Sequence, residues 1–343
     1  MYILFMPIVA QSYKVVSDSP LDIISFEECL VNSWAGEEAL LLFYVNAPTV
    51  IIGRNQNYWR EVSPSCKVPV FRRVSGGGAV YHDEGNLNWA LIVPRAIHSQ
   101  DDELAAVASA IGTLGVYARP GARGGIFVSL GDGETQGKIS GTARRFGTQN
   151  VLHHGTLLVS ADIAALKASL GGIKVFEDSS IASVPGHPVN LSRFLSSLSV
   201  EELMLHLSRT LAGSAPATIE LADFWNKEKT IARRVFKNPE DLEREFDFCV
   251  ECEEFEAHRK QFGSKEWIID RSPPFSVVVS NGRAKAVVRV QEGKILQVVP
   301  LEAGDSVSAR YADELNAHFE GMAFDFRMPE IMGKEYQRGI EAI

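Results

Sequence analysis

The stretch on which the interpretation of this sequence rests is Arg72-Arg-Val-Ser-Gly-Gly-Gly-Ala-Val-Tyr-His-Asp83. Its three consecutive glycines carry no side chain to pack, and each weakens a regular element by about 0.5–1 kcal/mol relative to alanine. Glycines in such a run allow backbone amides to approach a ligand closely and to form a concave nest for an anion. Two arginines precede the run and an apolar segment follows it. A strand, a glycine loop and a second strand, with an arginine at the entrance, predict a site for a charged small molecule.

The glycine loop differs from the common phosphate-binding loops. No Gly-Lys-Ser or Gly-Lys-Thr follows it at the spacing of a Walker loop. Ser75-Gly-Gly-Gly-Ala-Val80 also lacks the Gly-x-Gly-x-x-Gly order of a dinucleotide fold, and no helix is expected after it. A tight β-turn with spare glycines is the plainer alternative. The arginines before the loop and His82-Asp83 after it favour a ligand site over a bare turn.

Length and composition set limits on what the protein can be. A chain of 343 residues, 45% hydrophobic and 22% charged, fits a globular protein with one large and one smaller domain. The net charge of −9 argues against a general nucleic-acid binder, because such proteins carry a basic stripe. No apolar stretch approaches the roughly 20 residues that span a bilayer. We therefore expect neither nucleic acid nor a membrane as a partner.

The chain start and the cysteines bear on the compartment. Residues 1–10 are apolar, but they are short and lack a basic region, which makes a poor secretory signal and a poor transit peptide. Four cysteines in a chain of this length indicate a reducing compartment, not a disulfide scaffold. Cys249-Val-Glu-Cys252 has acidic neighbours and no second cysteine pair, so by itself it does not predict zinc or redox chemistry.

The apolar pattern predicts helices and strands in an irregular order. Helices are expected over residues 20–36, 101–114, 161–170, 201–211 and 311–319. Strands are expected over residues 13–16, 39–45, 49–53, 69–73, 79–82, 87–93, 126–130, 138–144, 151–159, 275–279, 284–290 and 295–299. Residues 39–45 and 49–53 are expected to form a hairpin across Asn46-Ala-Pro48, and residues 126–130 and 138–144 a second hairpin-like unit. Without regular βαβ alternation, a mixed sheet fits better than a parallel one.

Two further clusters carry chemically active side chains. Lys138 lies between Gly137 and small hydroxyl residues, where its ammonium can reach into a pocket and meet phosphate or carboxylate oxygens. A solvated strand lysine is the plainer alternative. His153 and His154 are adjacent on an expected strand and point to opposite faces, so they cannot both bind one metal ion. No His-x-His or His-Glu-x-x-His motif is present, and we therefore predict no metal site.

Together these clusters place two cations, Arg73 and Lys138, around a backbone nest. A ligase that activates a carboxylate needs such a site, because a carboxylate and a triphosphate repel each other and must be bridged by cations. Fixed donors aimed at the developing charge then stabilise the transition state at the α-phosphorus, and no serine or cysteine nucleophile is required.

The same residues resemble the motifs of one enzyme family. Residues 72–83, Lys138-Ile-Ser-Gly-Thr-Ala143 and His153-His-Gly-Thr-Leu-Leu158 look like the three motifs of lipoate–protein ligases and lipoyltransferases. Residues 46–57 and Glu27-Glu-Cys29 also fit, so the similarity runs from about residue 13 to residue 195, in order and at matching spacing. The tail, with Glu266-Trp267 and Pro274-Phe275, resembles the family's small accessory domain more weakly.

This resemblance implies a biotin/lipoate protein ligase fold. A mixed-sheet α/β (α+β) catalytic domain would cover residues 1–225, and a small α+β accessory domain would cover residues 226–343. Two half-reactions are implied, in which lipoate and ATP, with Mg²⁺, give lipoyl-adenylate, and the lipoyl group then passes to a lysine of a lipoyl domain. The acceptors would be E2 subunits of 2-oxoacid dehydrogenases and the glycine cleavage H protein.

The resemblance also implies roles for individual residues. Lys138 would be the catalytic residue, bridging the lipoyl carbonyl and the phosphate. The ATP- and adenylate-binding positions would be Arg73, Gly76, Gly77, Gly78, Ala79, Val80, Tyr81 and Lys138. The lipoate-binding positions would be Arg73, Val80, His82, Lys138, Ile139, His154 and Gly155.

The chain departs from the family pattern at one place. Many bacterial ligases have Gly-Arg-Asn-Asp before the second hairpin, where this chain has Arg119-Pro-Gly-Ala-Arg-Gly-Gly-Ile126. The missing carboxylate would have helped to organise Mg²⁺ near the phosphates. The change brings the chain closer to mitochondrial lipoyltransferases, which use a preactivated or protein-bound lipoyl donor. Ligase and transferase therefore remain rivals, and we expect a mitochondrial location for a eukaryotic protein and a cytoplasmic one otherwise.

Two further functions stay open. A non-catalytic lipoate- or nucleotide-binding protein of the same fold would bind the acyl-adenylate without modifying an acceptor, although the presence of Lys138 disfavours it. An octanoyl transferase that takes its acyl group from a carrier protein would need a cysteine near the acyl pocket. Cys66, a few residues before the glycine loop, is the nearest by sequence and is poorly placed.

Overall fold

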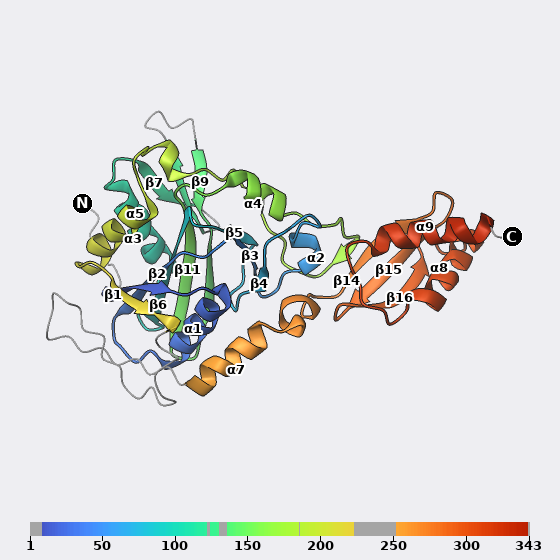
Figure 1. Cartoon of the computed structure of the whole chain (residues 1–343), viewed down its shortest axis with the longest axis horizontal. Helices are drawn as coiled ribbons and strands as arrows, with labels where there is room; N and C mark the ends of the chain where they lie inside the picture. The colour runs from blue at the N-terminus through green and yellow to red at the C-terminus, as the bar shows by residue number, and fades with distance from the viewer. Residues whose placement is uncertain (1–8, 122–123, 130–135, 185, 223–251, 342–343) are drawn as a thin grey trace.

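The computed structural model describes residues 9–121, 124–129, 136–184, 186–222 and 252–341, and it contains a large N-terminal unit and a smaller C-terminal unit (Figure 1). The large unit is built on a six-stranded sheet, with two three-stranded sheets beside it. The small unit has a sheet and two helices of its own. Within these ranges, no helix is long and apolar enough to cross a membrane.

The six-stranded sheet is mixed, so the prediction of a mixed sheet is confirmed. Its strands lie in the order β10-β11-β6-β2-β1-β13. Strand β1 runs parallel to β2 and to β13, whereas the pairs β2–β6, β6–β11 and β11–β10 are antiparallel. The bounds are Val9–Val16 (β1), Ala39–Tyr44 (β2), Asn86–Pro94 (β6), Thr142–Phe146 (β10), Asn150–Leu158 (β11) and Ala217–Glu220 (β13).

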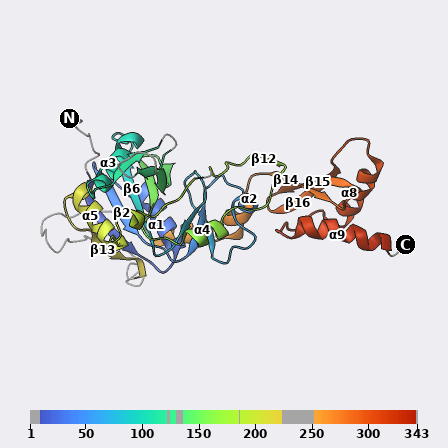
Figure 2. The same cartoon turned by 90° about the horizontal axis from the view of Figure 1, so that it is seen from above.

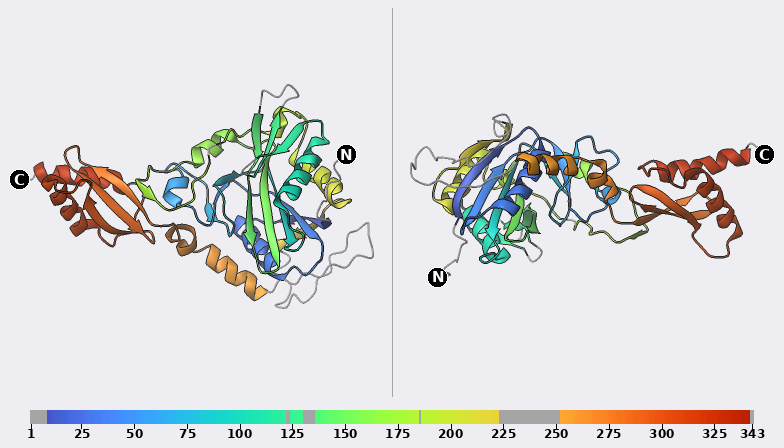
Figure 3. Two further views of the ribbon diagram at one scale, coloured as in Figure 1. Left: turned by 180° about the vertical axis from the view of Figure 1, so that it is seen from behind. Right: turned by 90° about the horizontal axis from the view of Figure 1, so that it is seen from below.

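Helices cover both faces of this sheet because its strands bury apolar side chains on each side. One face is covered by α1 (Pro20–Ser33) and α7 (Cys252–Phe262), which lie side by side (Figure 3). The other face is covered by α3 (Gln100–Gly112) and α5 (Val200–Ala212). Helix α1 begins where the sequence predicts, since Ser19 caps it by accepting from the N–H of Leu21, and Pro20 occupies its first turn. The short helices α4 (Ile163–Ser169) and η1 (Leu191–Arg193) follow β11.

The two three-stranded sheets hold the glycine loop and Lys138. In the first, β3 (Thr49–Ile52) pairs parallel with β4 (Val70–Arg72) and antiparallel with β5 (Val80–His82), so the glycine loop joins the two outer strands. In the second, β7 (Tyr117–Pro120), β8 (Ile126–Ser129) and β9 (Gln136–Ser140) are antiparallel neighbours. The expected hairpin-like unit is confirmed for β8 and β9, but the chain leaves it at Gly141 and enters β10 of the large sheet.

The predicted hairpin of residues 39–45 and 49–53 is wrong. Strand β2 pairs with β1 and β6, whereas β3 pairs with β4 and β5 in another sheet. Every residue of β2 is buried, because this strand lies in the middle of the large sheet with helices on both faces. Such a strand takes both of its neighbours from that sheet, and Asn46-Ala-Pro48 carries the chain from one sheet to the next.

The C-terminal unit packs two helices on one face of an antiparallel sheet (Figure 2). Its strands are β14 (Phe275–Ser280), β15 (Lys285–Gln291) and β16 (Lys294–Pro300), and its helices are α8 (Ser306–Phe319) and α9 (Met328–Glu341). The sequence predicts all of these except α9. A two-residue strand from the large unit, β12 (Glu177–Asp178), pairs with β14 at the edge of this sheet.

Arg72, the last residue of β4, holds the junction between the units, where β4 contacts the π-helical turn η2 (Glu266–Asp270). The short helix α2 (Tyr58–Glu61) begins two residues after Gln56, whose carbonyl oxygen also accepts from Arg72. The guanidinium of Arg72 is fully buried and donates to the carbonyl oxygens of Trp267 and Ile268 at 2.9 and 2.8 Å. Burial, with a smaller contribution from neighbouring arginines, lowers the pKa of Arg72 to about 9. The predicted boundary between the two domains, at residues 225 and 226, lies outside the described residues. Cys249 of the Cys249-Val-Glu-Cys252 motif lies outside them as well. Helix α7, which follows, packs on α1.

Candidate active site

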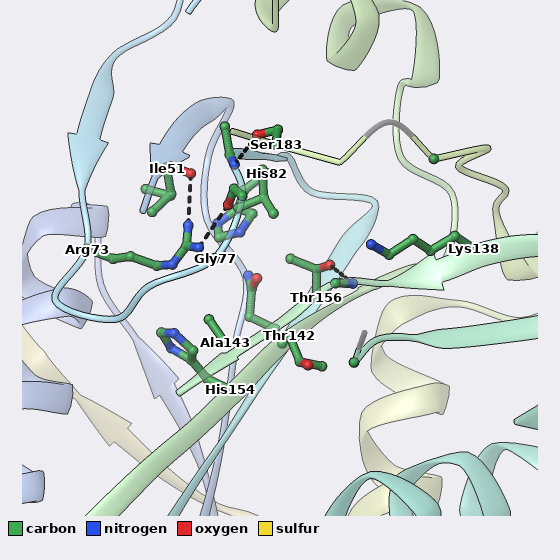
Figure 4. Close-up of a pocket in the computed structure, with 18 of the residues that line it drawn as sticks. Ile51, Arg73, Gly77, His82, Lys138, Thr142, Ala143, His154, Thr156 and Ser183 are labelled. Carbon is green, nitrogen blue, oxygen red and sulfur yellow. Dashed lines mark hydrogen bonds between the residues drawn. The ribbon is translucent and has the colours of Figure 1, made fainter. Parts of the chain in front are cut away.

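A cavity of about 700 Å³ lies between α1, the glycine loop, β9 to β11 and residues 181–184, 186 and 187, which are the described part of the segment of residues 181–187. Figure 4 shows part of its wall. Its larger apolar side chains are Ile23, Ile24, Ile51, Val80, Phe127, Ile181 and Val184. Its charged and polar side chains are Glu27, Tyr44, Asn46, Arg73, His82, Asn88, Lys138, Thr142, His154, Thr156, Ser183 and His187. Arg73 and Lys138 enter the cavity from opposite sides (Figure 4).

The glycine loop is wrapped around the side chain of Arg73. Arg73 is buried, and its guanidinium donates to the carbonyl oxygens of Gly76 and Gly78 and to that of Ile51. Gly77 adopts a φ of +82°, which favours glycine, and a Cβ at Gly53 would lie 2.2 Å from its carbonyl oxygen. Loop carbonyls therefore bind the protein's own arginine, while the loop also borders the cavity.

A hydrogen-bond relay connects Arg73 with α1. Arg73 Nε donates to Ser75 Oγ at 2.9 Å, which leaves the Ser75 hydroxyl to donate to His154 Nε2 at 2.7 Å. His154 then carries its proton on Nδ1, 3.1 Å from each carboxylate oxygen of Glu27. Glu27 also accepts from the Tyr44 hydroxyl at 2.9 Å, and burial together with this carboxylate raises the pKa of Tyr44. The relay fixes both the imidazole and the loop relative to the sheet.

Arg73 remains a cation in this relay. Burial lowers the pKa of Arg73 to about 10, while Tyr44 and Glu27 act in the opposite direction. The group is therefore protonated at neutral pH, and its positive charge stays at the cavity wall.

Lys138 is placed by glycines that make room for it. A Cβ at Gly125, which has a φ of +88°, would meet Ser140 O at 2.4 Å and Lys138 Cε at 3.1 Å. The backbone of Lys138 bonds to His187 O at 2.9 Å, which ties β9 to the segment of residues 181–187. Its ammonium makes no hydrogen bond or ion pair with the side chains and backbone that the structure describes, and burial lowers the pKa of Lys138. An uncompensated cation in a cavity is suited to an anionic ligand.

His82 and Asn46 at the cavity wall bond to each other, and each has one further polar atom without a partner among the described residues. His82 and Asn46 are 5% and 4% exposed, and His82 Nδ1 lies 3.0 Å from Asn46 Nδ2. Within the described part of the chain, His82 Nε2 and Asn46 Oδ1 are buried and unbonded. Burial, with help from Arg73, lowers the pKa of His82 to about 3, so that the imidazole is neutral at pH 7.

The segment of residues 181–187 is the part of the wall that the sequence did not predict. Ser183 Oγ accepts from the N–H of Ala79 at 2.8 Å and from Gln56 Nε2 at 3.0 Å, which fastens the segment to the glycine loop. Ile181 and Val184 border the cavity yet are 54% and 58% exposed. Such exposed aliphatic side chains identify this segment as part of the cavity wall once the structure is known. The sequence alone does not show that this segment lies against the glycine loop.

The structure brings most of the predicted site residues to the cavity. The wall includes Arg73, Gly77, Gly78, Ala79, Val80, His82, Lys138, His154 and Gly155. Three predicted residues lie apart from the wall, because Gly76 faces Arg73, Tyr81 packs with Val50 and Ile52, and Ile139 is buried among core residues below. Cys66 packs in the cluster of Tyr81 and is likewise not part of the wall.

The two adjacent histidines point to opposite faces of β11, as predicted. His153 is fully buried on the α3 face, where its Nδ1 lies 2.6 Å from Glu103 Oε2. Glu103 Oε1 lies 2.7 Å from Nδ1 of a third histidine, His98, and accepts from the N–H of Ser99. Burial lowers the pKa of His153, although Glu103 opposes the shift. This cluster lies outside the cavity and is part of the core.

The family of the chain follows from comparison with known proteins. A model of the lipoyl protein ligase A/B catalytic domain matches residues 19–212. Lipoate–protein ligase 1 of Staphylococcus aureus is 34% identical to the chain over 210 residues, which are 58% of this chain and 61% of that ligase. The match thus spans less than two thirds of the relative's length.

Solved structures show the same fold at low sequence identity. LipL1 of Plasmodium falciparum, solved in complex with lipoate, matches with a TM-score of 0.59 at 20% identity and covers 96% of this chain and 98% of its own. The bi-partite lipoate protein ligase of Thermoplasma acidophilum comes from a structural study that includes its E2 lipoyl domain. It matches with a TM-score of 0.53 at 21% identity, and the match covers 75% of this chain and 96% of that ligase chain. The predicted ligase-like fold is confirmed. Because the family model covers more than half of its residues, the chain belongs to the lipoyl protein ligase A/B catalytic domain family.

Proposed function

We propose that this protein attaches lipoate to a lysine of a lipoyl domain through a lipoyl-adenylate bound in the cavity. The observation that carries the proposal is the ammonium of Lys138, which enters the cavity without a protein partner among the described residues. Its environment needs a negative charge, and an acyl-adenylate supplies one at its phosphate. The family, with the relative in Staphylococcus aureus that is named a ligase, supports the same assignment.

The shape and lining of the cavity fit the two halves of such a ligand. Its volume of about 700 Å³ falls within the range of about 300–1,000 Å³ that is usual for pockets that bury small molecules. Aliphatic side chains from α1, β3 and β5 (Ile23, Ile24, Ile51 and Val80) offer an apolar surface to the lipoyl chain. The glycine loop leaves the backbone accessible beside them, where the nucleotide half would lie.

Lys138 would act in both half-reactions. In the first, a carboxylate oxygen of lipoate attacks the α-phosphorus of ATP and pyrophosphate leaves, and the ammonium offsets the repulsion between the two anions. In the second, the amine of the acceptor lysine attacks the acyl carbon, loses a proton, and AMP leaves with the electron pair of the broken bond. The same ammonium then stabilises the leaving phosphate.

Among the described residues that line the cavity, no carboxylate is free to bind magnesium. Glu27 is the only acidic side chain among the described residues that line it, and this carboxylate already accepts from Tyr44 and His154. The turn that faces Lys138 contains Gly124 and Gly125. These glycines belong to the stretch of residues 119–126 in which, by the family resemblance, the Asn-Asp pair of many bacterial ligases is missing. The described residues of the wall therefore do not fit a metal ion held by the protein alone, and with these residues a magnesium ion would have to arrive with the nucleotide.

This turn favours a second candidate function, a lipoyltransferase that takes a preactivated lipoyl group. The transfer half-reaction needs only the acyl-adenylate, the acceptor amine and the ammonium of Lys138. Activation of lipoate additionally needs the triphosphate to be held in place, and the described residues of the wall offer no free carboxylate for that purpose.

Two incubations separate these functions. The protein is mixed with an apo lipoyl domain and either lipoate plus MgATP or synthetic lipoyl-adenylate, and the mass of the acceptor is measured. A ligase lipoylates the acceptor in both mixtures, whereas a transferase does so only with the adenylate. Calorimetric binding of the adenylate without any acceptor modification would indicate a non-catalytic binding protein. The absence of both binding and modification contradicts the proposal.

A further inference from the structure

A second cluster of ligating side chains lies outside the cavity, between α1 and α7. Cys29 of α1 and Glu254 and His258 of α7 each present one donor atom, and the three atoms lie within 4.8 Å of one another. The two helices pack side by side at this place (Figure 3). The transfer chemistry proposed above uses none of these three residues.

The donor set has the composition of a zinc site. Thiolate sulfur, imidazole nitrogen and carboxylate oxygen are the three ligand types of Zn²⁺, and one of each gives a charge that neutralises the ion. Bond lengths of about 2.0–2.3 Å in a tetrahedral site place ligand atoms roughly 3.3–3.8 Å apart. Separations within 4.8 Å therefore close around a metal ion with small side-chain movements.

The side chains around the cluster hold two of its donors in place. Nε2 of His258 is buried and lies 3.4 Å from Glu254 Oε1, and the angle of this contact does not make a hydrogen bond. Asn32 Nδ2 donates to Glu254 Oε1 at 3.1 Å, as outer partners of metal-binding carboxylates do. The ring of His258 stacks on Phe262 at an angle of 3°.

A zinc ion bound by these three side chains would have a fourth coordination position open to water. The Cys29 thiol is fully buried, whereas the side chains of Glu254 and His258 are 34% and 19% exposed. A water molecule can therefore reach the ion from the side of α7, and three protein ligands with one water form a complete zinc coordination sphere.

We propose that Cys29, Glu254 and His258 bind a zinc ion that fastens α7 to α1. The sequence does not predict this site because Cys29 is far along the chain from the other two ligands. Helix α1 also carries Ile23, Ile24 and Glu27 of the cavity wall. The ion thus stabilises the wall from behind, without contact with the substrate, and its presence does not depend on the function proposed for the cavity.

Metal binding is measured on the untagged full chain after removal of metals with a chelator and reduction with a phosphine. We expect one Zn²⁺ per chain by elemental analysis and a rise in Tm of about 5 °C on zinc addition. Cobalt(II) in place of zinc should give tetrahedral absorption bands in the visible and a thiolate-to-metal charge-transfer band in the near ultraviolet. No bound zinc and no thiolate band in the wild-type protein would overturn the proposal.

Substitutions identify the ligands. Cys29→Ala should abolish the thiolate band, and Glu254→Gln and His258→Gln, which lie at partly exposed positions, should abolish stoichiometric binding while the circular dichroism spectrum stays unchanged. Asn32→Ala removes only the outer hydrogen bond and should weaken binding about 10-fold. Cys66→Ala and His318→Ala are matched controls away from the cluster and should bind zinc as the wild type does.

The lone cysteine pair in the sequence offers the competing thiolates. Cys249 lies outside the described residues, and Cys252 opens α7. A thiolate band that persists in Cys29→Ala but disappears in the Cys249→Ala, Cys252→Ala double variant would contradict the assignment of Cys29.

Discussion

Adjacent histidines lie on the two faces of β11, and each bonds to a buried carboxylate, but only one of them borders the cavity. His154 faces α1, bonds to the carboxylate of Glu27 and borders the cavity. His153 faces α3, bonds to the carboxylate of Glu103 and lies in a closed core. Both pairs are buried, so burial and a carboxylate partner do not by themselves mark a functional residue.

What separates the two faces is the unpaired polar groups that border an open volume. On the cavity face, the ammonium of Lys138 and Nε2 of His82 have no partner among the described residues and border the cavity. On the far face, Nε2 of His153 is also buried and unbonded among the described residues, but the His153–Glu103–His98 cluster does not line the cavity. We therefore expect changes on the cavity face to alter activity more than stability, and changes on the far face to do the reverse.

The largest effect is expected for Lys138→Ala. Removal of the ammonium takes away the charge that stabilises the transition state, and loss of one such donor costs about 100- to 1,000-fold in rate. Lipoyl transfer from synthetic lipoyl-adenylate should fall by that factor, while Tm stays near that of the wild type. Lys14→Ala, which removes a surface lysine paired with Glu201, should leave the rate unchanged. Equal rates for Lys138→Ala and the wild type would remove Lys138 from the mechanism.

The next effect is expected on the far face, for Glu103→Gln. This change leaves His153 and His98 with an amide in place of a buried carboxylate, and it should lower the free energy of unfolding by about 1–3 kcal/mol. Urea unfolding measures the loss, and the rate per folded molecule should not change. A large fall in rate at unchanged stability would show that the far face takes part in the reaction.

A fall in pH should lower the free energy of unfolding through His82 at the cavity wall. The folded-state pKa of His82 is about 3, below the usual value near 6.5, so below pH 6.5 the unfolded chain takes up a proton that the folded protein excludes. Between pH 7 and pH 5.5 this group should remove about 1 kcal/mol of stability. His82→Asn should lose that part of the pH dependence in urea unfolding. An identical pH dependence in the variant and the wild type would mean that the pKa of His82 is the same in the folded and the unfolded protein.

The smallest effect is expected for Ser183→Ala, which removes the side-chain contact between the glycine loop and the segment of residues 181–187 but leaves the backbone hydrogen bonds of that segment in place. The hydrogen bond from the N–H of Ala79 to Ser183 Oγ contributes about 1 kcal/mol, equivalent to about a five-fold change. KM for the adenylate should rise by that factor, with kcat unchanged. An unchanged KM would show that this contact does not order the loop.

The sequence predicts local features of the molecule better than it predicts which parts lie together. The glycine loop, the strands of the C-terminal unit and the opposite orientations of His153 and His154 follow from local chemistry and spacing. The predicted pairing of β2 with β3 is wrong. The neighbours of β2 are set by burial on both faces of a sheet whose strands are distant in the sequence.

The same limit applies to the site. Lys138 and Arg73 are marked by the glycines beside them, whereas the segment of residues 181–187 carries no motif. It becomes part of the wall through hydrogen bonds of Ile181, Ser183 and His187 to distant segments. The partnership of Glu27 with His154 also joins distant segments. Contacts of this kind are set by the packing of α1 and β11, which no local pattern shows.

The most direct test is calorimetric binding of a non-hydrolysable lipoyl-adenylate, in which a sulfamate replaces the phosphate. We measure it for the wild type, Lys138→Ala and Glu103→Gln. Binding to the cavity predicts equal affinity for the wild type and Glu103→Gln, and an affinity about 100-fold lower for Lys138→Ala, because one partner of a buried charge pair is removed. No binding by the wild type, or equal affinity in all three proteins, would contradict the assignment of this cavity to the acyl-adenylate.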